Sequence, residues 1–207
     1  MASRKKSIAQ DNQRLFIGVR PDSDTQQFLD GLVSHAKRTL GAGRSSPIRW
    51  TSHTNRHLTL AFLGETSADL VAEIEQRMQV IASELQRCTG RIAALHPFPQ
   101  RKSRLLVAEL LGNPDLDRLH RRCRQLMMDI GLKPESAVFR PHITLARSPR
   151  GFAAMKAQAV DFSVNIGNLV LYESLMAPGG SQYLPLIELP LCTSEQPGDQ
   201  TDLSPLV

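Results

Sequence analysis

The strongest constraint on the fold of this chain is a short pattern, His-x-Thr-Leu-Ala, that occurs twice. Residues 57–64 read HLTLAFLG and residues 142–147 read HITLAR. Both copies lie in hydrophobic runs of strand length, and successive side chains of a strand point to opposite faces. Burying an imidazole or a hydroxyl without a partner is costly. Either each copy finds its own partners inside a core, or both copies open onto one shared site.

Strict alternation predicts which side chains of the first copy share a face. His57 and Thr59 lie together, with Asn55 and Ala61 at the same parity. Phe62 belongs to the opposite, apolar face, which we expect to pack in the core. The first copy therefore predicts a strand with a polar His–Thr face and an apolar back.

The second copy predicts the same arrangement. Arg140, His142 and Thr144 share a face by parity, and the residues between them are apolar. Arg147 falls on the face opposite His142, unless the strand ends or bulges there. One His-x-Thr in an apolar strand is typical of a structural residue pair, but two copies with matching Leu-Ala flanks favour a functional site.

The rest of the chain alternates between strand patterns and amphipathic helix patterns. Strands are expected at residues 14–19, 56–63, 91–98, 104–110, 138–147, 162–174 and 181–189. Helices are expected at residues 22–40, 67–87, 114–131 and, as a short one, 151–158. Each half of the chain carries one motif strand and at least one long helix. This indicates an α+β or α/β pattern with an internal duplication.

The polar ends of the chain set the expected domain boundaries. We expect one domain over residues 14–191, a flexible N-terminal extension over residues 1–13 and a flexible tail over residues 192–207. No apolar run approaches the length of a membrane span. The three cysteines form no CxxC pair, which argues against a disulfide framework and a zinc site and is typical of a reducing compartment. We therefore expect a cytoplasmic protein.

The charge balance indicates an anionic partner. The net charge is +5, and 19 of the 25 basic residues are Arg, whose planar fork matches phosphate and carboxylate. A basic balance alone is also typical of a solvated surface.

The two motifs together suit acid–base chemistry on a phosphate. Imidazole exchanges protons near neutral pH, so two histidines on opposite sides of a phosphorus atom can act as acid and base at once. Threonine hydroxyls can donate to the non-bridging oxygens. This chemistry needs no metal and no cofactor.

The residues that carry the motifs also resemble a known family. HLTLAFLGE (57–65) and FRPHITLAR (139–147) are similar to the paired signatures of the two-histidine (2H) phosphoesterases. The most similar branch is the RNA 2′,3′-cyclic phosphodiesterases, also called 2′–5′ RNA ligases, and the resemblance extends over roughly residues 14–190. It implies an α+β fold of two pseudo-symmetric lobes, in which antiparallel sheets line a central cleft and helices lie outside.

The resemblance also implies an activity and residue roles. Family members open 2′,3′-cyclic phosphates, commonly leaving a 2′-phosphate, and some join RNA ends through a 2′–5′ bond without ATP. On this chain, His57 would protonate the leaving 3′-oxygen, His142 would activate water, and Thr59 and Thr144 would hold the phosphate oxygens. The near symmetry of the site leaves the exchange of the two histidine roles open.

Several further residues are candidates for substrate contacts. Arg140 has the right parity to face the phosphate, and Arg147 completes the second signature. Phe16 and Tyr183 could stack on a base, although Phe16 is more simply a core residue. His53 could lie at the mouth of the cleft. We place Arg140 and Arg147 with the substrate-binding residues.

The expected partners are RNA ends or nucleotides that bear a 2′,3′-cyclic phosphate. We expect the protein to be a monomer that binds no membrane and no metal. Two alternatives stay open from sequence. One is ATP-independent 2′–5′ ligation in the same site, since both directions use the same acid and base. The other is a non-catalytic module that binds RNA or nucleotides in the same cleft.

Overall fold

The computed structural model describes residues 12–41, 48–178 and 180–193 of the chain. The strands are β1 (Asn12–Val19), β2 (Arg49–Trp50), β3 (Leu58–Ser67), β4 (Cys88–Phe98), β5 (Leu105–Leu110), β6 (His142–Arg147), β7 (Gln158–Ile166), β8 (Asn168–Ala177) and β9 (Gly180–Pro190). The helices are α1 (Ser23–Leu40), α2 (Val71–Glu84) and α3 (Pro114–Asp129), with single 3-10 turns η1 (His53–Asn55) and η2 (Ala68–Leu70). Strands and helices alternate through both halves of the chain.

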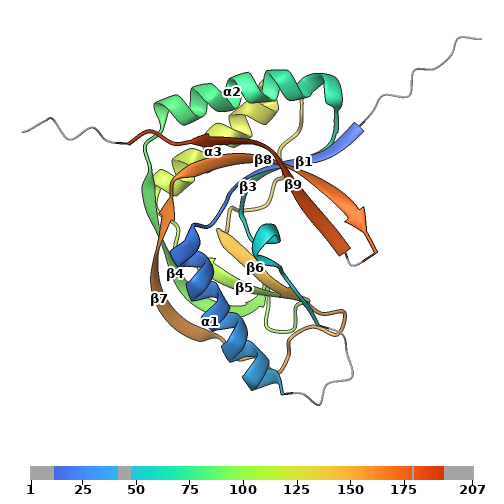
Figure 1. Cartoon of the computed structure of the whole chain (residues 1–207), viewed down its shortest axis with the longest axis vertical. Coiled ribbons are helices and arrows are strands. Elements are labelled where there is room, and N and C mark those ends of the chain that lie inside the picture. Colours follow the sequence, from blue (N-terminus) through green and yellow to red (C-terminus); the bar gives the residue numbers. More distant parts are fainter. Residues whose placement is uncertain (1–11, 42–47, 179, 194–207) are drawn as a thin grey trace, which may run out of the picture.

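The strands form one antiparallel sheet in the order β7-β4-β5-β6-β3-β1-β8-β9, and β2 pairs with β6 (Figure 1). The two motif strands, β3 and β6, meet at the centre through a single residue pair, Leu58 with Ile143. Apart from β2, the sheet therefore consists of two four-stranded halves that are joined where the two motifs touch.

The sheet is strongly curved. Gly167 alone separates β7 from β8, although these strands lie near opposite ends of the strand order. The two halves must therefore bend toward each other, which makes a concave face between them.

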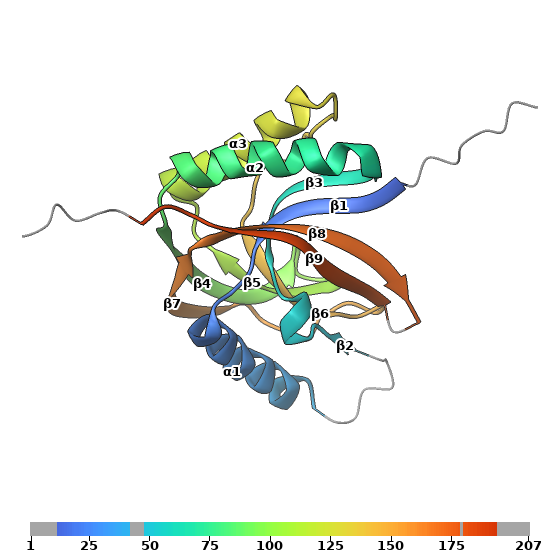
Figure 2. The same ribbon diagram turned by 45° about the horizontal axis from the view of Figure 1, so that its top comes forward.

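Helices cover the outer sides of both halves. α2 and α3 pack together against strands of the β3-β1-β8-β9 half, and α1 packs against β7 (Figure 2). Asp22 caps the first turn of α1 by accepting from the backbone N of Thr25 at 2.9 Å, and Asn113 caps α3 in the same way at Leu116. The inner, concave face carries no helix, so it is left for a site.

The predicted α+β class, with an antiparallel sheet and helices outside, is confirmed. The predicted single strand over residues 162–174 is wrong, because Gly167 divides it into β7 and β8, which belong to different halves of the sheet. The predicted short helix over residues 151–158 is also wrong. Phe152 and Met155 are fully buried there, and the N–H of Phe152 donates to the carbonyl of Ser103 instead of to a helical partner.

The ends of the packed region differ from the predicted boundaries. Asn12 and Gln13 belong to β1, where they pair with Ser67 and Thr66, so they are not part of an extension. Cys192 pairs with Gln86, so the packed region continues past residue 191. The predictions for residues 1–11 and 194–207 lie outside the described residues.

Candidate active site

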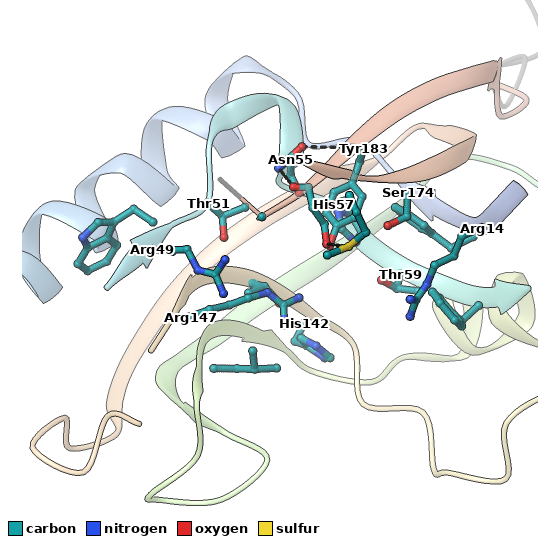
Figure 3. A pocket seen from close by; sticks show the side chains of 18 residues that line it. Arg14, Arg49, Thr51, Asn55, His57, Thr59, His142, Arg147, Ser174 and Tyr183 are labelled. Carbon is teal, nitrogen blue, oxygen red and sulfur yellow. Dashed lines mark hydrogen bonds between the residues drawn. The ribbon is translucent and has the colours of Figure 1, made fainter. Parts of the chain in front are cut away.

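A cavity of about 500 Å³ opens on the concave face at the junction of the two halves (Figure 3). Five of the six predicted site residues line it: His57, Thr59, His142, Thr144 and Arg147. The Leu58–Ile143 pair fixes their relation. Extended by one residue each way, this antiparallel register sets each histidine across from the threonine of the other motif. The two copies therefore open onto one shared site.

A β-bulge interrupts the alternation of the first copy. The register of β1 against β3 shifts between Ile17 and Gly18, so one residue of β3 is extra. Leu60 and Ala61 are consecutively buried, at 2% and 5% exposure, and Phe62 lines the cavity. The parity prediction for Ala61 and Phe62 is therefore wrong, because the extra residue returns the chain to the site face.

The second copy bulges at the equivalent leucine. The register of β5 against β6 shifts between Leu106 and Val107, and Leu145 and Ala146 are both fully buried. The bulge turns Arg147 into the cavity, which resolves the parity question in favour of the site face. The shared Leu-Ala of the two motifs thus supplies the two consecutive core residues that each bulge needs.

A bulge leaves a carbonyl without its ladder partner, and each copy satisfies it differently. The Leu60 carbonyl accepts from Nδ1 of His120 at 2.7 Å, and the Leu145 carbonyl accepts from the backbone N of Thr51 at 2.9 Å. His120 also stacks on Phe139 with ring centroids 3.9 Å apart. His120 is half-buried because it reaches from α3 to the bulge in β3.

Backbone carbonyls orient both catalytic candidates in the same way. Nδ1 of His57 lies 2.8 Å from the carbonyl oxygen of Asn55, and Nδ1 of His142 lies 2.7 Å from that of Arg140. A carbonyl only accepts, so Nδ1 carries the proton in both rings. The unprotonated Nε2 atoms have no hydrogen-bond partner among the described residues. In this tautomer each Nε2 can accept a proton and later return it.

Burial keeps both imidazoles neutral at neutral pH. The pKa of His57 is lowered to about 4: burial is the largest cause, the charges of Arg147 and His142 also lower it, and the hydrogen bond to the Asn55 carbonyl opposes the decrease. Burial also lowers the pKa of His142, with the Arg140 carbonyl and Glu109 opposing and Arg147 adding to the decrease. An anion bound between the two rings would favour their protonation.

The threonine hydroxyls are free to contact a ligand. Thr59 and Thr144 both line the cavity, and within the described ranges neither hydroxyl makes a hydrogen bond. Gly18 allows the close approach of β1 behind this site, because a Cβ there would lie 2.7 Å from the carbonyl oxygen of Leu58.

Aromatic rings form a wall beside His57. The ring centroid of Phe16 lies 4.6 Å from that of His57, and Tyr183 approaches the same imidazole edge-on at 4.9 Å. Phe16 is only 2% exposed, which agrees with the core role, whereas Tyr183 is half-buried at the cavity. On the other side, Phe98 stacks on His142 at 4.2 Å.

Arg140 is not brought into the cavity. Its guanidinium donates to Glu109, with Nη2 2.6 Å from Oε1, and lies over the ring of Phe98. The ion pair with the Glu109 carboxylate holds the side chain away from the cavity. His53 likewise does not line the cavity, since its Nε2 pairs with Asp30.

Sequence reasoning missed much of the cavity wall. Arg14, Arg49 and Ser174 line it, together with Thr51 and Met176, and no aspartate or glutamate is among the lining residues. These residues come from β1, β2 and the β8–β9 hairpin, which meet only in the folded chain. Asn55 is the lining residue that the sequence did indicate, because strand alternation places it on the same face as His57.

Asn55 connects the first motif to the β8–β9 hairpin. Its side-chain amide donates to the carbonyl of Ser181 at 2.8 Å, and its side-chain oxygen accepts from the backbone N of Tyr183 at 3.1 Å. The carbonyl that orients His57 is therefore itself held in place by β9. Among the residues that the structure describes, no group of three His, Cys, Asp or Glu side chains is arranged to hold a metal ion.

A family model and several known proteins match this chain. The family model described as "2′-5′ RNA ligase superfamily" matches residues 35–174, which include both motifs. The chain belongs to this superfamily. A relative in Aeropyrum pernix, RNA 2′,3′-cyclic phosphodiesterase, is 29% identical over 156 residues, covering 72% of this chain and 89% of that protein.

Solved structures share the fold of this chain. A Thermus thermophilus protein, TT0787, is similar with a TM-score of 0.77 at 20% identity, covering 87% of this chain and 99% of that chain. E. coli LigT complexed with 3′-AMP is similar with a TM-score of 0.65 at 24% identity, with the same coverage of each chain. Within the described ranges, no helix is long and apolar enough to span a membrane.

Proposed function

We propose that this member of the 2′-5′ RNA ligase superfamily hydrolyses 2′,3′-cyclic phosphates on RNA ends or nucleotides. The observation that carries the proposal is the pair of imidazoles in one arginine-lined cavity, each with Nδ1 held by a carbonyl and Nε2 available. The name of the Aeropyrum pernix relative supports the same activity.

The proposed reaction is an in-line displacement at phosphorus. One imidazole Nε2 takes a proton from water as the water oxygen bonds to phosphorus, and the other gives a proton to the departing 3′-oxygen. The bond from phosphorus to the 3′-oxygen breaks, which leaves a 2′-phosphomonoester and a 3′-hydroxyl. Thr59 and Thr144 donate to the non-bridging oxygens, and Arg147 stabilises their negative charge. The site residues in these roles require no metal or cofactor.

The role of each histidine is part of the proposal. His57 protonates the leaving oxygen, and His142 activates the water. Because burial holds the pKa of His57 at about 4 in the empty cavity, this assignment requires the bound phosphate to raise it. An anion beside a buried imidazole has that effect, since the opposite charge stabilises the protonated ring.

The experiment is the hydrolysis of a nucleoside 2′,3′-cyclic phosphate in EDTA, with the product identified by phosphorus NMR. The wild type is expected to release the 2′-phosphate at an unchanged rate in the chelator. His35→Ala is the matched control, since this half-buried α1 histidine does not line the cavity. Loss of turnover on chelation, or full activity in both His57→Ala and His142→Ala, contradicts the mechanism.

The description of the superfamily favours a second candidate, the joining of RNA ends. In that reaction a 5′-hydroxyl oxygen bonds to the phosphorus of a 2′,3′-cyclic phosphate while the bond from phosphorus to the 3′-oxygen breaks. The hydroxyl proton is taken up by one imidazole and the 3′-oxygen is protonated by the other, which leaves a 2′–5′ phosphodiester and a 3′-hydroxyl without ATP. The test incubates RNA that ends in a 2′,3′-cyclic phosphate with RNA that begins with a 5′-hydroxyl. Ligation gives a joined RNA, whereas hydrolysis gives a 2′-phosphate end. Ligation at a rate below hydrolysis would leave the phosphodiesterase as the principal activity.

We further propose that the protein acts as a monomer in the cytoplasm. The three cysteines of the described chain are free thiols, which suits a reducing compartment. Light scattering of the purified full-length chain tests the monomer, and a dimer mass contradicts it.

A further inference from the structure

Two arginines face each other directly on the outer part of the cavity wall. Arg49 of β2 is the cross-strand partner of Arg147 of β6, and both side chains line the cavity. Like charges directly opposite each other destabilise a sheet. Such a pair is therefore expected to have an anionic ligand.

Nothing in the described protein neutralises this pair. No acidic side chain lines the cavity, and among the described residues neither guanidinium forms an ion pair or a hydrogen bond. The β8–β9 hairpin leaves space for Arg49 at Gly180, where a Cβ would lie 3.0 Å from Nη1. Two planar forks on one wall are suited to an oxyanion that accepts several hydrogen bonds.

Of the two arginines, Arg147 lies at the position proposed for the scissile phosphate and Arg49 lies beyond it. Arg147 is close enough to both histidines to lower their pKa values. Arg49 lies one strand farther out, and Figure 3 shows Arg49, Arg147 and His142 along the same wall. Neighbouring strands lie about 4.8 Å apart, so Arg49 lies farther from the cyclic phosphate than Arg147 does and reaches a neighbouring group of the substrate.

We propose that Arg49, together with Arg147, binds a second phosphate on the 5′ side of the nucleotide that bears the cyclic phosphate. This inference rests on the proposed function. The cyclic phosphate occupies the 3′ end, so a second phosphate on the same substrate has to come from the 5′ side. It is either the phosphodiester of an RNA chain or the 5′-phosphate of a mononucleotide.

The test compares three substrates: a nucleoside 2′,3′-cyclic phosphate, its 5′-phosphorylated form, and a dinucleotide that ends in a cyclic phosphate. Arg49→Gln is expected to raise the KM of a substrate with a second phosphate about tenfold more than the KM of the nucleoside, because a charge-assisted hydrogen bond is lost. Arg49→Lys keeps the charge and is expected to retain part of the preference. Arg104→Gln is the matched control, since Arg104 is exposed next to β5 but does not line the cavity.

The outcomes separate this proposal from the proposed function. A selective effect on the dinucleotide assigns the subsite to RNA, and a selective effect on the 5′-phosphorylated nucleotide assigns it to a terminal phosphate. Equal changes for all three substrates, no change in Arg49→Gln, or the same selectivity in Arg104→Gln overturns the proposal. If the wild type turns over none of the substrates, the proposed function fails. The subsite is then tested by calorimetric binding of the dinucleotide to the wild type and Arg49→Gln, where equal affinities overturn it.

Discussion

The two copies of the motif share one local structure but differ in what surrounds it. Both contain a His-x-Thr pair, a bulge at the following leucine, and a carbonyl two residues upstream that holds Nδ1 of the histidine. After the bulge, the first copy presents Phe62 to the cavity and the second presents Arg147. The catalytic pair is therefore nearly symmetric, whereas the charge around it is not.

This difference shows how a duplicated site can acquire a direction. The residue after the second bulge, Arg147, carries a charge itself, whereas Phe62 after the first bulge is uncharged and lies beneath the guanidinium of Arg14, 5.1 Å from its ring centroid. A phosphate with a sugar on one side and water on the other is not symmetric either. We infer that the surroundings, and not the motif itself, decide which imidazole acts as the acid.

Removing one imidazole at a time is expected to give the largest effects. His57→Ala and His142→Ala should each lower kcat by about 10²- to 10⁴-fold, the usual contribution of one positioned proton transfer. A substrate with sulfur in place of the bridging 3′-oxygen separates the roles, because a thiolate leaves without protonation. Turnover of this substrate by stopped-flow should be restored in His57→Ala but not in His142→Ala.

The reverse pattern, with rescue of His142→Ala alone, would exchange the two roles and leave the acid–base pair intact. Rescue of neither variant would mean that protonation of the leaving oxygen is not what either ring contributes. His35→Ala serves as the control here too, with full activity on both substrates.

The sequence predicted those features of the two motifs that depend only on the local alternation of side chains. The period of two placed His57 with Thr59 on one face, and His142 with Thr144, because no bulge intervenes within either pair. The bulges could not be predicted, because the extra leucine is as apolar as its neighbours and only the partner strand reveals the shift. Arg49 was missed for a related reason, since a two-residue strand gives no periodicity.

The residue after each bulge is the next place to test the comparison. Arg147→Gln is expected to lower kcat/KM about 10- to 100-fold, since a cation near the reacting phosphate is lost. Because the charge of Arg147 lowers the pKa of both histidines, its removal should also move the pH optimum upward. Phe62→Leu, the matched change in the first copy, should leave the optimum in place. A pH–rate series on both variants measures this, and equal shifts in the two variants would contradict it.

The pH profile of the wild type tests the shared burial of the two rings. In the free enzyme the base must be neutral and the acid protonated, so kcat/KM has its maximum between the two pKa values. Burial lowers both below the ordinary value of 6.5. The optimum should therefore lie below pH 6.5, with about a tenfold loss for each pH unit on the alkaline limb. A kcat/KM that is still rising at pH 7.5 would show that the histidines are not buried from solvent in the free enzyme.

The smallest expected effect comes from the contact that supports the first bulge. The Leu145 carbonyl accepts from a backbone N–H, so no side-chain substitution removes this hydrogen bond. The Leu60 carbonyl instead accepts from the imidazole of His120, which a substitution can remove. His120→Ala should lower the free energy of unfolding by about 1–3 kcal/mol, the cost of leaving a buried acceptor unpaired. It should lower kcat about fivefold with little change in KM, because Thr59 precedes the bulge.

His120→Asn can place an amide nitrogen near the position of Nδ1 and should recover part of kcat. A loss of stability with unchanged kcat, measured by chemical denaturation and steady-state kinetics, would show that the first copy holds its bulge without α3.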